Sequence, residues 1–353
     1  MKKLVSLLMA LCMMVSLAAC GGQEQTTDEG GAESDNGGYK IAFSNSYVGN
    51  AWRTAAVNIF DAYTADLVEQ GVLSKAYSSS AGDDVQAQIN EIRNMMPEAY
   101  AAIVCIAASA TGLQSVLEEA AERGIVVVCF DTTVDSDLVY NVNTDQFEYG
   151  RLLAQSLADR MGGEGNILWI KGIEGNQVTL DRTEGMQSVL DNYPGINVLG
   201  DGYGKWDDST TASVMSNLMS AYASQGIDGI LSEGGGGHAI VQSLVENGVD
   251  PATVPISEGE MFNSFMKDWV EMDLDAFCTA QPPYLAAAAV DVALKVLNGE
   301  GVEPMTYVDL PTCSSKEEAE EKWYQPDQEG GFVCDWTDNN NTWNLTIEDV
   351  APN

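Results

Sequence analysis

Residues 101–131 read AAIVCIAASATGLQSVLEEAAERGIVVVCFD, and this stretch decides the fold. Two short apolar runs, 101–106 and 125–130, enclose a segment, 113–123, in which apolar residues recur at helical spacing. Gly124 then provides the stop that commonly follows a helix. A strand buried on both faces, a helix and a second buried strand make one unit of a parallel sheet that is covered by helices.

The same alternation continues on both sides of this unit. Further strand-like apolar runs occupy residues 40–43, 166–170, 229–231 and 277–280. Segments with helical spacing occupy residues 51–70, 84–96, 147–161 and 212–224. Because strands alternate with helices throughout, the pattern predicts an α/β protein with parallel sheets. The roughly 300 residues that follow residue 38 exceed one small sheet and fit two domains.

The first 38 residues predict an exported, lipid-anchored chain. Residues 1–19 combine two early lysines with an apolar run, as a secretory signal peptide does, and that run is too short to span a membrane. The sequence LAAC at residues 17–20 resembles the bacterial lipobox, in which the cysteine is acylated and becomes the new N-terminus. Residues 20–38 lack large apolar side chains and predict a flexible tether. We therefore expect a protein held at the outer face of the bacterial cytoplasmic membrane through lipid on Cys20.

The charge balance excludes one class of partner. The chain carries 16 Lys and Arg against 53 Asp and Glu, which gives a net charge of −37. Removal of residues 1–19, which contain two lysines and no acids, makes the charge of the mature chain −39. Nucleic-acid binding requires clustered Lys and Arg, so no nucleic-acid partner is expected. Contact with the membrane should run through the lipid alone, because anionic headgroups repel an acidic surface.

The seven cysteines divide by position. Cys12 and Cys20 belong to the leader and to the lipid site. The apolar surroundings of the next three predict small buried residues at Cys105, Cys129 and Cys278. Cys313 and Cys334 lie in a polar C-terminal stretch, where an extracytoplasmic location permits a disulfide, so this pair is the disulfide candidate. No CxxC spacing occurs, and neither a metal nor another cofactor is expected.

A series of short motifs follows in a fixed order between residues 39 and 310. In chain order they are Gly124–Asp131, Val142–Asp145 with Gly150, Gly162–Ile167, Gly172–Gly175, Arg182–Gly185, Trp206-Asp207, Ile256–Gly259, Ala280–Pro283 and Leu297–Glu300. Each motif alone is weak, but their order and spacing together resemble the type I periplasmic binding proteins of the ribose and galactose class. The stretches 43–53 and 110–112 look most like the branch of this family that binds galactofuranose-type sugars.

The resemblance implies both a fold and a function. Members of this family have two Rossmann-like lobes with parallel sheets, joined by a hinge of three strands, and they bind a small sugar in the cleft between the lobes. Carried over, it predicts a first lobe of residues 39–144 plus 282–310 and a second lobe of 145–281 plus 311–353, the latter including the C-terminal tail. It also implies an ABC permease with ATPase subunits as the partner that receives the sugar, and a monomer.

A sugar site needs carboxylates and amides for the hydroxyls and an aromatic face for the ring. The candidate ligand-binding residues are Asp131, Arg182, Gln281, Trp52, Trp206, Glu258, Arg53, Asn50, Glu233, Thr144 and Asn176. Asp131 ranks first, because packing explains poorly why an acid closes an apolar strand, although it is also a possible helix N-cap. Arg182 can donate two parallel hydrogen bonds or form a salt bridge between the lobes. Gln281 can serve the hinge alone, and Trp52 can belong to the core.

Three positions depart from the family pattern. Glu233, followed by the glycines 234–237, stands where members often carry Asn-Asp, and Glu258 stands where an aspartate is usual. Thr132 follows Asp131, whereas ribose binders often have an arginine there. The pocket should therefore be reshaped, and ribose is not assumed to be its ligand.

Other functions compete with sugar capture. The glycines 234–237 lack both the Lys-Ser/Thr of a P-loop and the spacing of a dinucleotide site. An enzyme with a nucleophile and a histidine base would have to use the single histidine, His238, which has no nucleophile signature beside it, so no enzyme is expected. A sensory lipoprotein would bind its ligand in the same way and differ only in its partner. A nucleoside, an autoinducer or an amino acid stays open as the cargo.

Overall fold

The computed structural model describes residues 37–351. The signal peptide at 1–19, the lipid site at Cys20 and nearly all of the tether lie outside the described residues, so these assignments stay predictions. None of the helices in the described range is both long and apolar enough to cross a membrane.

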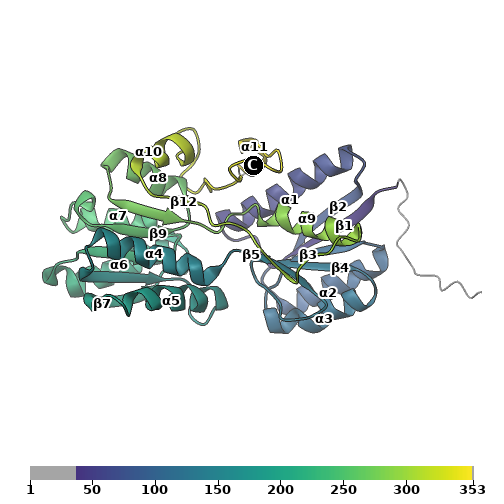
Figure 1. The fold of residues 1–353 in the computed structure, drawn as a ribbon, viewed down its shortest axis with the longest axis horizontal. Coiled ribbons are helices and arrows are strands. Elements are labelled where there is room, and N and C mark those ends of the chain that lie inside the picture. The colour runs from purple at the N-terminus through teal and green to yellow at the C-terminus, as the bar shows by residue number, and fades with distance from the viewer. Residues whose placement is uncertain (1–36, 352–353) are drawn as a thin grey trace, which may run out of the picture. The chain divides into compact units, whose positions relative to one another are not determined.

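Two six-stranded sheets form the framework (Figure 1). The first sheet has the order β11-β5-β4-β3-β1-β2, and all of its pairings are parallel. Its strands are β1 (Tyr39–Asn45), β2 (Leu73–Ser80), β3 (Ala102–Ile106), β4 (Val126–Phe130), β5 (Tyr140–Asn143) and β11 (Met305–Tyr307). The α/β prediction is confirmed.

The second sheet has the order β12-β10-β9-β8-β6-β7, and within it only β12 runs antiparallel to its neighbour. Its strands are β6 (Glu164–Lys171), β7 (Gly195–Tyr203), β8 (Gly229–Ser232), β9 (Ile256–Gly259), β10 (Ala276–Thr279) and β12 (Thr312–Cys313). The chain passes between the sheets three times: from β5 into the helix at Gln146, from β10 into the helix at Leu285, and from β11 to β12.

Helices cover both faces of the first sheet. They are α1 (Ala51–Glu69), α2 (Val85–Met95), α3 (Ala110–Glu122) and α9 (Leu285–Leu297). Val128 and Phe130 of β4 belong to the apolar cluster that includes α1 and α9, whereas Val127 and Cys129 belong to the cluster with α2 and α3. Successive side chains of a strand point to opposite faces, so burial on both sides explains the unbroken apolar run at residues 125–130.

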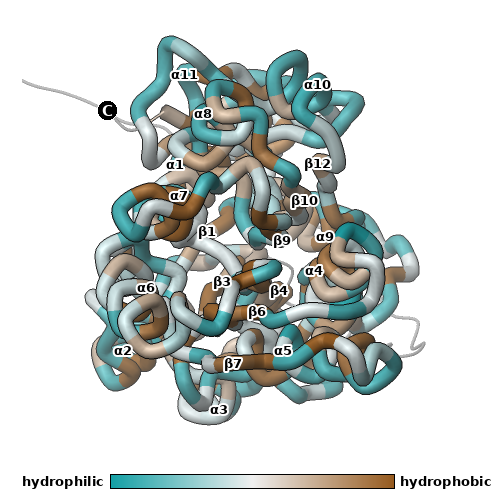
Figure 2. The backbone as a smooth tube through the Cα atoms, turned by 90° about the vertical axis from the view of Figure 1, so that its left-hand side faces the viewer, coloured by the Kyte–Doolittle hydropathy of each residue, from teal (hydrophilic) through white to brown (hydrophobic). Residues whose placement is uncertain are grey.

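The second sheet is covered in the same way. Its helices are α4 (Gln146–Arg160), α5 (Gln177–Leu190), α6 (Asp208–Tyr222), α7 (Gly237–Glu246) and α8 (Asn263–Met272). Trp169 of β6 packs with α4 and α5, while its neighbours Leu168 and Ile170 join the cluster that holds α6, α7 and α8. In Figure 2 the tube is brown along β4, where the residues are hydrophobic, and teal around α10, where they are hydrophilic.

Short helical turns complete the chain. They are η1 (Met96–Glu98), η2 (Ala223–Gln225), η3 (Pro251–Thr253), α10 (Lys316–Glu318), the π-helical η4 (Ala319–Trp323) and α11 (Ile347–Val350).

Residues 311–353, which were predicted to belong to the second lobe, contact both lobes. The turns α10 and η4 do pack against α8, but α11 packs against α1 of the other lobe. The Asn58 side chain in α1 donates to the carbonyl oxygens of Val350 and Ala351, both at 3.3 Å. Leu345 and Val350 are buried apolar anchors of this contact, which the polar composition of the tail conceals.

The predicted disulfide is contradicted by the structure. Cys313 and Cys334 are both free thiols, and each is buried in the apolar core rather than exposed in a polar tail. Cys313 lies in β12 directly opposite Cys278 of β10, so it serves as a packing residue of the sheet. The Cys334 thiol lies 3.7 Å from the side-chain oxygen of Asn263.

Candidate ligand-binding site

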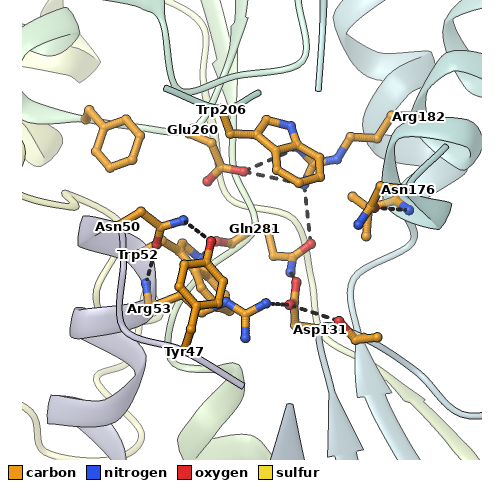
Figure 3. A pocket seen from close by; sticks show the side chains of 13 residues that line it. Tyr47, Asn50, Trp52, Arg53, Asp131, Asn176, Arg182, Trp206, Glu260 and Gln281 are labelled. Carbon is orange, nitrogen blue, oxygen red and sulfur yellow. Dashed lines mark hydrogen bonds and ion pairs between the residues drawn. The ribbon is translucent and has the colours of Figure 1, made fainter. Parts of the chain in front are cut away.

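A cavity opens between the two sheets at the carboxyl ends of their strands (Figure 3). It encloses about 630 Å3, including space that is open to solvent. Its lining residues are Tyr47, Asn50, Trp52, Arg53, Asp131, Thr132, Asn176, Val178, Arg182, Trp206, Glu260, Phe262 and Gln281. Open parallel sheets bind ligands at this edge, because the loops that follow the strands converge there.

Asp131 lies at the centre of the polar contacts. It follows β4 directly and adopts the left-handed backbone conformation, with φ of 61°. One carboxylate oxygen accepts from the Arg53 guanidinium at 2.9 Å, and the other accepts from the Gln281 side-chain amide at 2.5 Å. Arg53 belongs to the first lobe and Gln281 to the connection that leaves the second sheet, so Asp131 joins the two at the cavity.

The beginning of α1 orients Arg53. Asn50 is the N-cap of α1, and its side-chain oxygen accepts from the Arg53 backbone amide at 2.8 Å. The Arg53 guanidinium also donates to the Ser46 hydroxyl at 3.1 Å and to the Asn45 side chain at 3.3 Å, both at the end of β1. These contacts fix the guanidinium against Asp131, where both side chains are largely buried.

Arg182 provides the second buried cation. It lies on α5 and is 2% exposed. Its guanidinium donates to the Gln146 side chain at 2.8 Å and to the Glu233 carbonyl at 2.9 Å, and it stacks on the Tyr149 ring at 3.6 Å. Gln146 in turn donates to Gln281, which continues the network from the second lobe to Asp131.

Glu260 is the acid that faces Arg182. One carboxylate oxygen lies 3.4 Å from the guanidinium and accepts from the Tyr149 hydroxyl at 3.2 Å. Burial raises the pKa of Glu260 and outweighs the opposing effect of Arg182. The other carboxylate oxygen has no hydrogen-bond partner among the described residues.

Aromatic side chains from both lobes flank these polar groups. Trp206 lies in the loop between β7 and α6, and its indole N–H has no partner among the described residues. The Trp52 indole N–H donates to the Gln281 carbonyl at 2.6 Å, and the ring also packs in the core of the first lobe. Trp52 therefore fulfils both of the roles considered for it, as a core residue and as part of the cavity wall.

Three residues of this lining have a strained backbone. Asp131, Trp206 and Glu260 all have positive φ, at 61°, 54° and 71°. Residues other than glycine rarely adopt this conformation, and it persists where the surrounding structure enforces it, most often at functional sites. All three follow a strand end and present a side chain to the same cavity.

Most of the predicted site residues are brought together here. Those that line the cavity are Asp131, Arg182, Gln281, Trp52, Trp206, Arg53, Asn50 and Asn176. Asn176 has a second role, because its side chain caps α5. The structure thus places the residues of this group in one cavity, although they come from α1, α5 and five different connections.

Three predicted residues do not line this cavity. Glu233 is fully buried, and its carboxylate accepts from the Gly172 amide and the Thr183 hydroxyl, each at 2.9 Å. Thr144 is also buried, and its hydroxyl accepts from Gln146. Glu258 accepts from the Gly236 amide at 3.2 Å and borders an adjoining hollow. Glu233 and Thr144 therefore stabilise connections behind the wall, whereas Glu258 lies at the edge of the adjoining hollow.

Five lining residues were not predicted: Tyr47, Thr132, Val178, Glu260 and Phe262. Glu260 was the one that chemistry could have identified. The sequence reads Ser257-Glu258-Gly259-Glu260, and the acid beyond the strand end, rather than the acid within the strand, reaches the cavity. The apolar members carry no signal of their own in the sequence.

Comparison with known proteins places this architecture in a family. The family described as periplasmic binding protein domain matches residues 41–301. The xylitol-binding protein of Mycolicibacterium smegmatis is 30% identical over 172 residues, which are 48% of this chain and 49% of that protein. The D-xylose-binding periplasmic protein of Haemophilus influenzae is 32% identical over 100 residues, 28% of this chain and 30% of that protein. The chain thus matches about half the length of these curated relatives, or less.

Solved structures share the fold. An ABC transporter solute binding protein from Thermobispora bispora superposes with a TM-score of 0.75 at 20% identity and covers 88% of this chain and 95% of its own. A galactofuranose binding protein superposes with a TM-score of 0.70 at 20% identity, over 80% of this chain and 96% of its own. The family match over residues 41–301 agrees with the structure, which has two six-stranded α/β lobes and a cavity at the ends of their strands. The chain belongs to the periplasmic binding protein domain family.

Proposed function

We propose that this protein captures a small carbohydrate in the cavity between its lobes and delivers it to an ABC importer. The observation that carries the proposal is the composition of the cavity, where Asp131, Arg53 and Gln281 meet Arg182 and Glu260 between aromatic rings. Sugar hydroxyls both donate and accept hydrogen bonds, and the C–H faces of the ring pack on aromatic side chains.

Two unpaired polar atoms support a ligand that carries hydroxyls. The Glu260 carboxylate offers an acceptor and the Trp206 indole offers a donor, and neither has a partner among the described residues. Leaving a buried polar group unpaired costs about 1–3 kcal/mol, so a hydroxyl that pairs with such an atom is favoured. An apolar ligand would leave both atoms unpaired.

The relatives support the same class of ligand. The two quoted above are named as binders of xylitol and D-xylose, and one structural neighbour is named as a galactofuranose binder. In the proposal, lipid on Cys20 holds a monomer at the outer face of the cytoplasmic membrane, and a permease with ATPase subunits takes up the released sugar. Replacing Cys20 with Ala should release the protein into the medium, and retention of this variant in the membrane fraction would argue against the anchor.

The direct test is a thermal-shift screen, followed by calorimetry, on the chain from residue 21 onward. The panel contains pentoses, hexoses and sugar alcohols, with nucleosides and amino acids as the competing classes. We expect a sugar or sugar alcohol to raise the melting temperature and to bind with a micromolar or tighter Kd, without being consumed. If only a nucleoside or an amino acid binds, the proposed carbohydrate ligand is wrong. Turnover of the sugar would contradict a purely binding role.

A sensory role is the second candidate for the partner. One structural neighbour is named as the fructose binding periplasmic domain of a hybrid two component system, with a TM-score of 0.67 at 17% identity. Uptake of the radiolabelled sugar by cells with and without this protein separates the two roles. The importer proposal requires uptake to fall in the deletion strain, whereas a sensor would change gene expression and leave initial uptake intact.

A further inference from the structure

The C-terminal tail lies beyond the part of the chain that matches the family. The match ends at residue 301, and residues 314–351 continue as an ordered segment that contacts both lobes. Figure 1 shows this segment in yellow, running from α10 to α11. Its two ends have different partners.

The first part of the tail pairs with the wall of the cavity. The Asn263 backbone amide donates to the Phe332 carbonyl at 2.9 Å, and the Cys334 backbone amide donates to the Met261 carbonyl at 2.9 Å. Phe262 and Val333 form an antiparallel bridge between these bonds. The Asn263 side chain also donates to the carbonyls of residues 325 and 328, both at 2.9 Å. The segment 260–264 supplies the lining residues Glu260 and Phe262, so the tail braces one wall of the cavity from behind.

The last part of the tail is fixed to the other lobe. The Trp343 ring stacks on Tyr284 at 5.1 Å, and its indole N–H donates to Asp291 of α9 at 2.8 Å. Tyr63 of α1 donates to the second oxygen of Asp291 at 2.5 Å. Tyr284 lies in the connection between β10 and α9, which is one of the three segments that join the sheets. This anchor therefore contacts both the first lobe and the hinge.

Residues 335–342 connect the two anchors. A chain extends by at most about 3.5 Å per residue, so this span limits how far the cavity wall can move from α9 while both anchors hold. Asp335 at the start of the span is fully buried and residues 336–338 are half-buried, whereas residues 339–342 are exposed. The exposed part forms a turn in which the Asp338 carboxylate accepts from the Thr342 backbone amide at 2.8 Å and from its hydroxyl at 2.6 Å, so lengthening the span requires this turn to break.

We infer that the tail is a strap that ties the cavity wall at 260–264 to the first lobe, restricts opening of the cleft and thereby increases ligand affinity. This inference rests on the proposed function for its effect on affinity, but not for its effect on opening. Ligand binds productively to the fraction of molecules in the binding-competent arrangement, and its apparent Kd rises as that fraction falls. A strap that limits opening keeps this fraction high.

The test compares three variants of the chain from residue 21 onward. One lacks residues 341–353, which removes the anchor on the first lobe and leaves the pairing at 330–334 intact. The second is Trp343→Ala. The third, Trp343→Phe, is the matched control, because it keeps an aromatic ring on Tyr284 and loses only the bond to Asp291.

Opening is measured as the distance between spin labels on Leu138→Cys and Leu180→Cys, one on each lobe. Both positions are exposed, at 47% and 51%, whereas the native cysteines of the described residues are buried. Without ligand, we expect longer and broader distances in the truncated chain and in Trp343→Ala, and distances close to the parent in Trp343→Phe. Kd for the best sugar from the screen should rise about threefold or more in the first two variants, with faster dissociation.

The outcomes separate the strap from simple packing. A lower melting temperature with unchanged label distances and unchanged Kd would overturn the inference, because it would show that the tail only stabilises the fold. If the truncated chain fails to fold, Trp343→Ala decides by the same criteria. If no sugar binds the parent chain, the proposed function fails, and the label distances without ligand still decide whether the tail restricts opening.

Discussion

At the scale of single residues, Asp131 is the group on which ligand binding should depend most. Replacing Asp131 with Ala removes the acceptor for Arg53 and Gln281 and leaves a largely buried guanidinium without its carboxylate. In the proposed complex a buried sugar hydroxyl also loses its acceptor, at a cost of about 1–3 kcal/mol, which corresponds to roughly tenfold or more in Kd. Calorimetry with the sugar identified in the screen measures the effect.

The control for this prediction is Asp131→Asn. Asparagine tolerates the left-handed backbone found at this position and keeps one acceptor, so the fold should be retained. We expect an intermediate loss of affinity. Parent-like Kd values for both variants would show that Asp131 holds Arg53 in place without contributing to ligand binding.

Buried acids behind the cavity predict how stability depends on pH. Burial raises the pKa of Glu258 from 4.5 to about 8 and that of Glu233 to about 7. Between pH 4.5 and these values the unfolded chain has released protons that the folded protein still holds. The free energy of unfolding therefore falls as pH rises through this window and levels off above about 8.

Glu258→Gln tests this dependence, because the amide cannot ionise. The decrease in melting temperature between about pH 5 and pH 8 should become shallower in this variant. Glu246→Gln on the exposed face of α7 matches the change in net charge and should keep the parent slope. Equal slopes in all three proteins would mean that Glu258 ionises without cost in the folded state.

The residues of the cavity could be predicted where chemistry and strand position coincide. Asp131 follows an apolar strand, and Arg182 begins the motif Arg182–Gly185 that resembles the family, so both could be selected from the sequence. Glu233 and Glu258 gave the same signal, yet they satisfy backbone amides inside the protein. Whether an acid faces the cavity or a neighbouring loop depends on side-chain direction and loop conformation, which strand position alone does not determine.

At the scale of elements, the crossing of α4 and α5 positions Arg182. A Cβ atom on Gly150 of α4 would lie 2.0 Å from the Arg182 carbonyl, and one on Gly185 of α5 would lie 2.0 Å from the Phe147 carbonyl. Both obstructing atoms are backbone, so they cannot rotate away. The two helices approach this closely only because each has a glycine at the contact.

Gly150→Ala should therefore move α5 and Arg182 together. Overpacking of this kind costs about 1–3 kcal/mol, and we expect a melting temperature several degrees lower. Kd for the sugar should also rise, because the guanidinium shifts within the cavity. Gly301→Ala is the control, since a Cβ there meets no atom within 4 Å. If Gly150→Ala lowers stability and keeps the parent Kd, the crossing supports the fold without positioning Arg182.

The strands missed in the sequence lie mostly at sheet edges. The strands β2 and β7 end the two sheets, and their residues alternate in exposure or remain largely exposed, so neither forms an apolar run. Central strands such as β3 and β4 are buried on both faces and were predicted close to their observed bounds. Edge strands depend on hydrogen bonds to one neighbour, and that contribution leaves little trace in composition.

At the scale of the whole molecule, polar contacts already run from one lobe to the other. The path goes from Arg182 through Gln146 and Gln281 to Asp131 and Arg53. The order of the motifs predicted two lobes and a shared cleft, but this network and the strap could not be predicted. Both depend on contacts between residues that are far apart in the sequence and share no periodic pattern.

Ligand binding should make the whole molecule more compact, because a sugar that contacts both lobes favours the closed arrangement. Small-angle scattering of the parent chain should show a smaller radius of gyration at saturating sugar than without it. Arg182→Ala and Asp131→Ala remove a contact from opposite lobes, so each should reduce this compaction at a given sugar concentration. At sugar concentrations that saturate the variants, a radius of gyration that stays larger than that of the parent shows a defect in closure rather than in affinity. A parent protein that binds sugar with an unchanged radius would place the ligand in a cleft that is already closed, and the two lobes would then act as a rigid receptor.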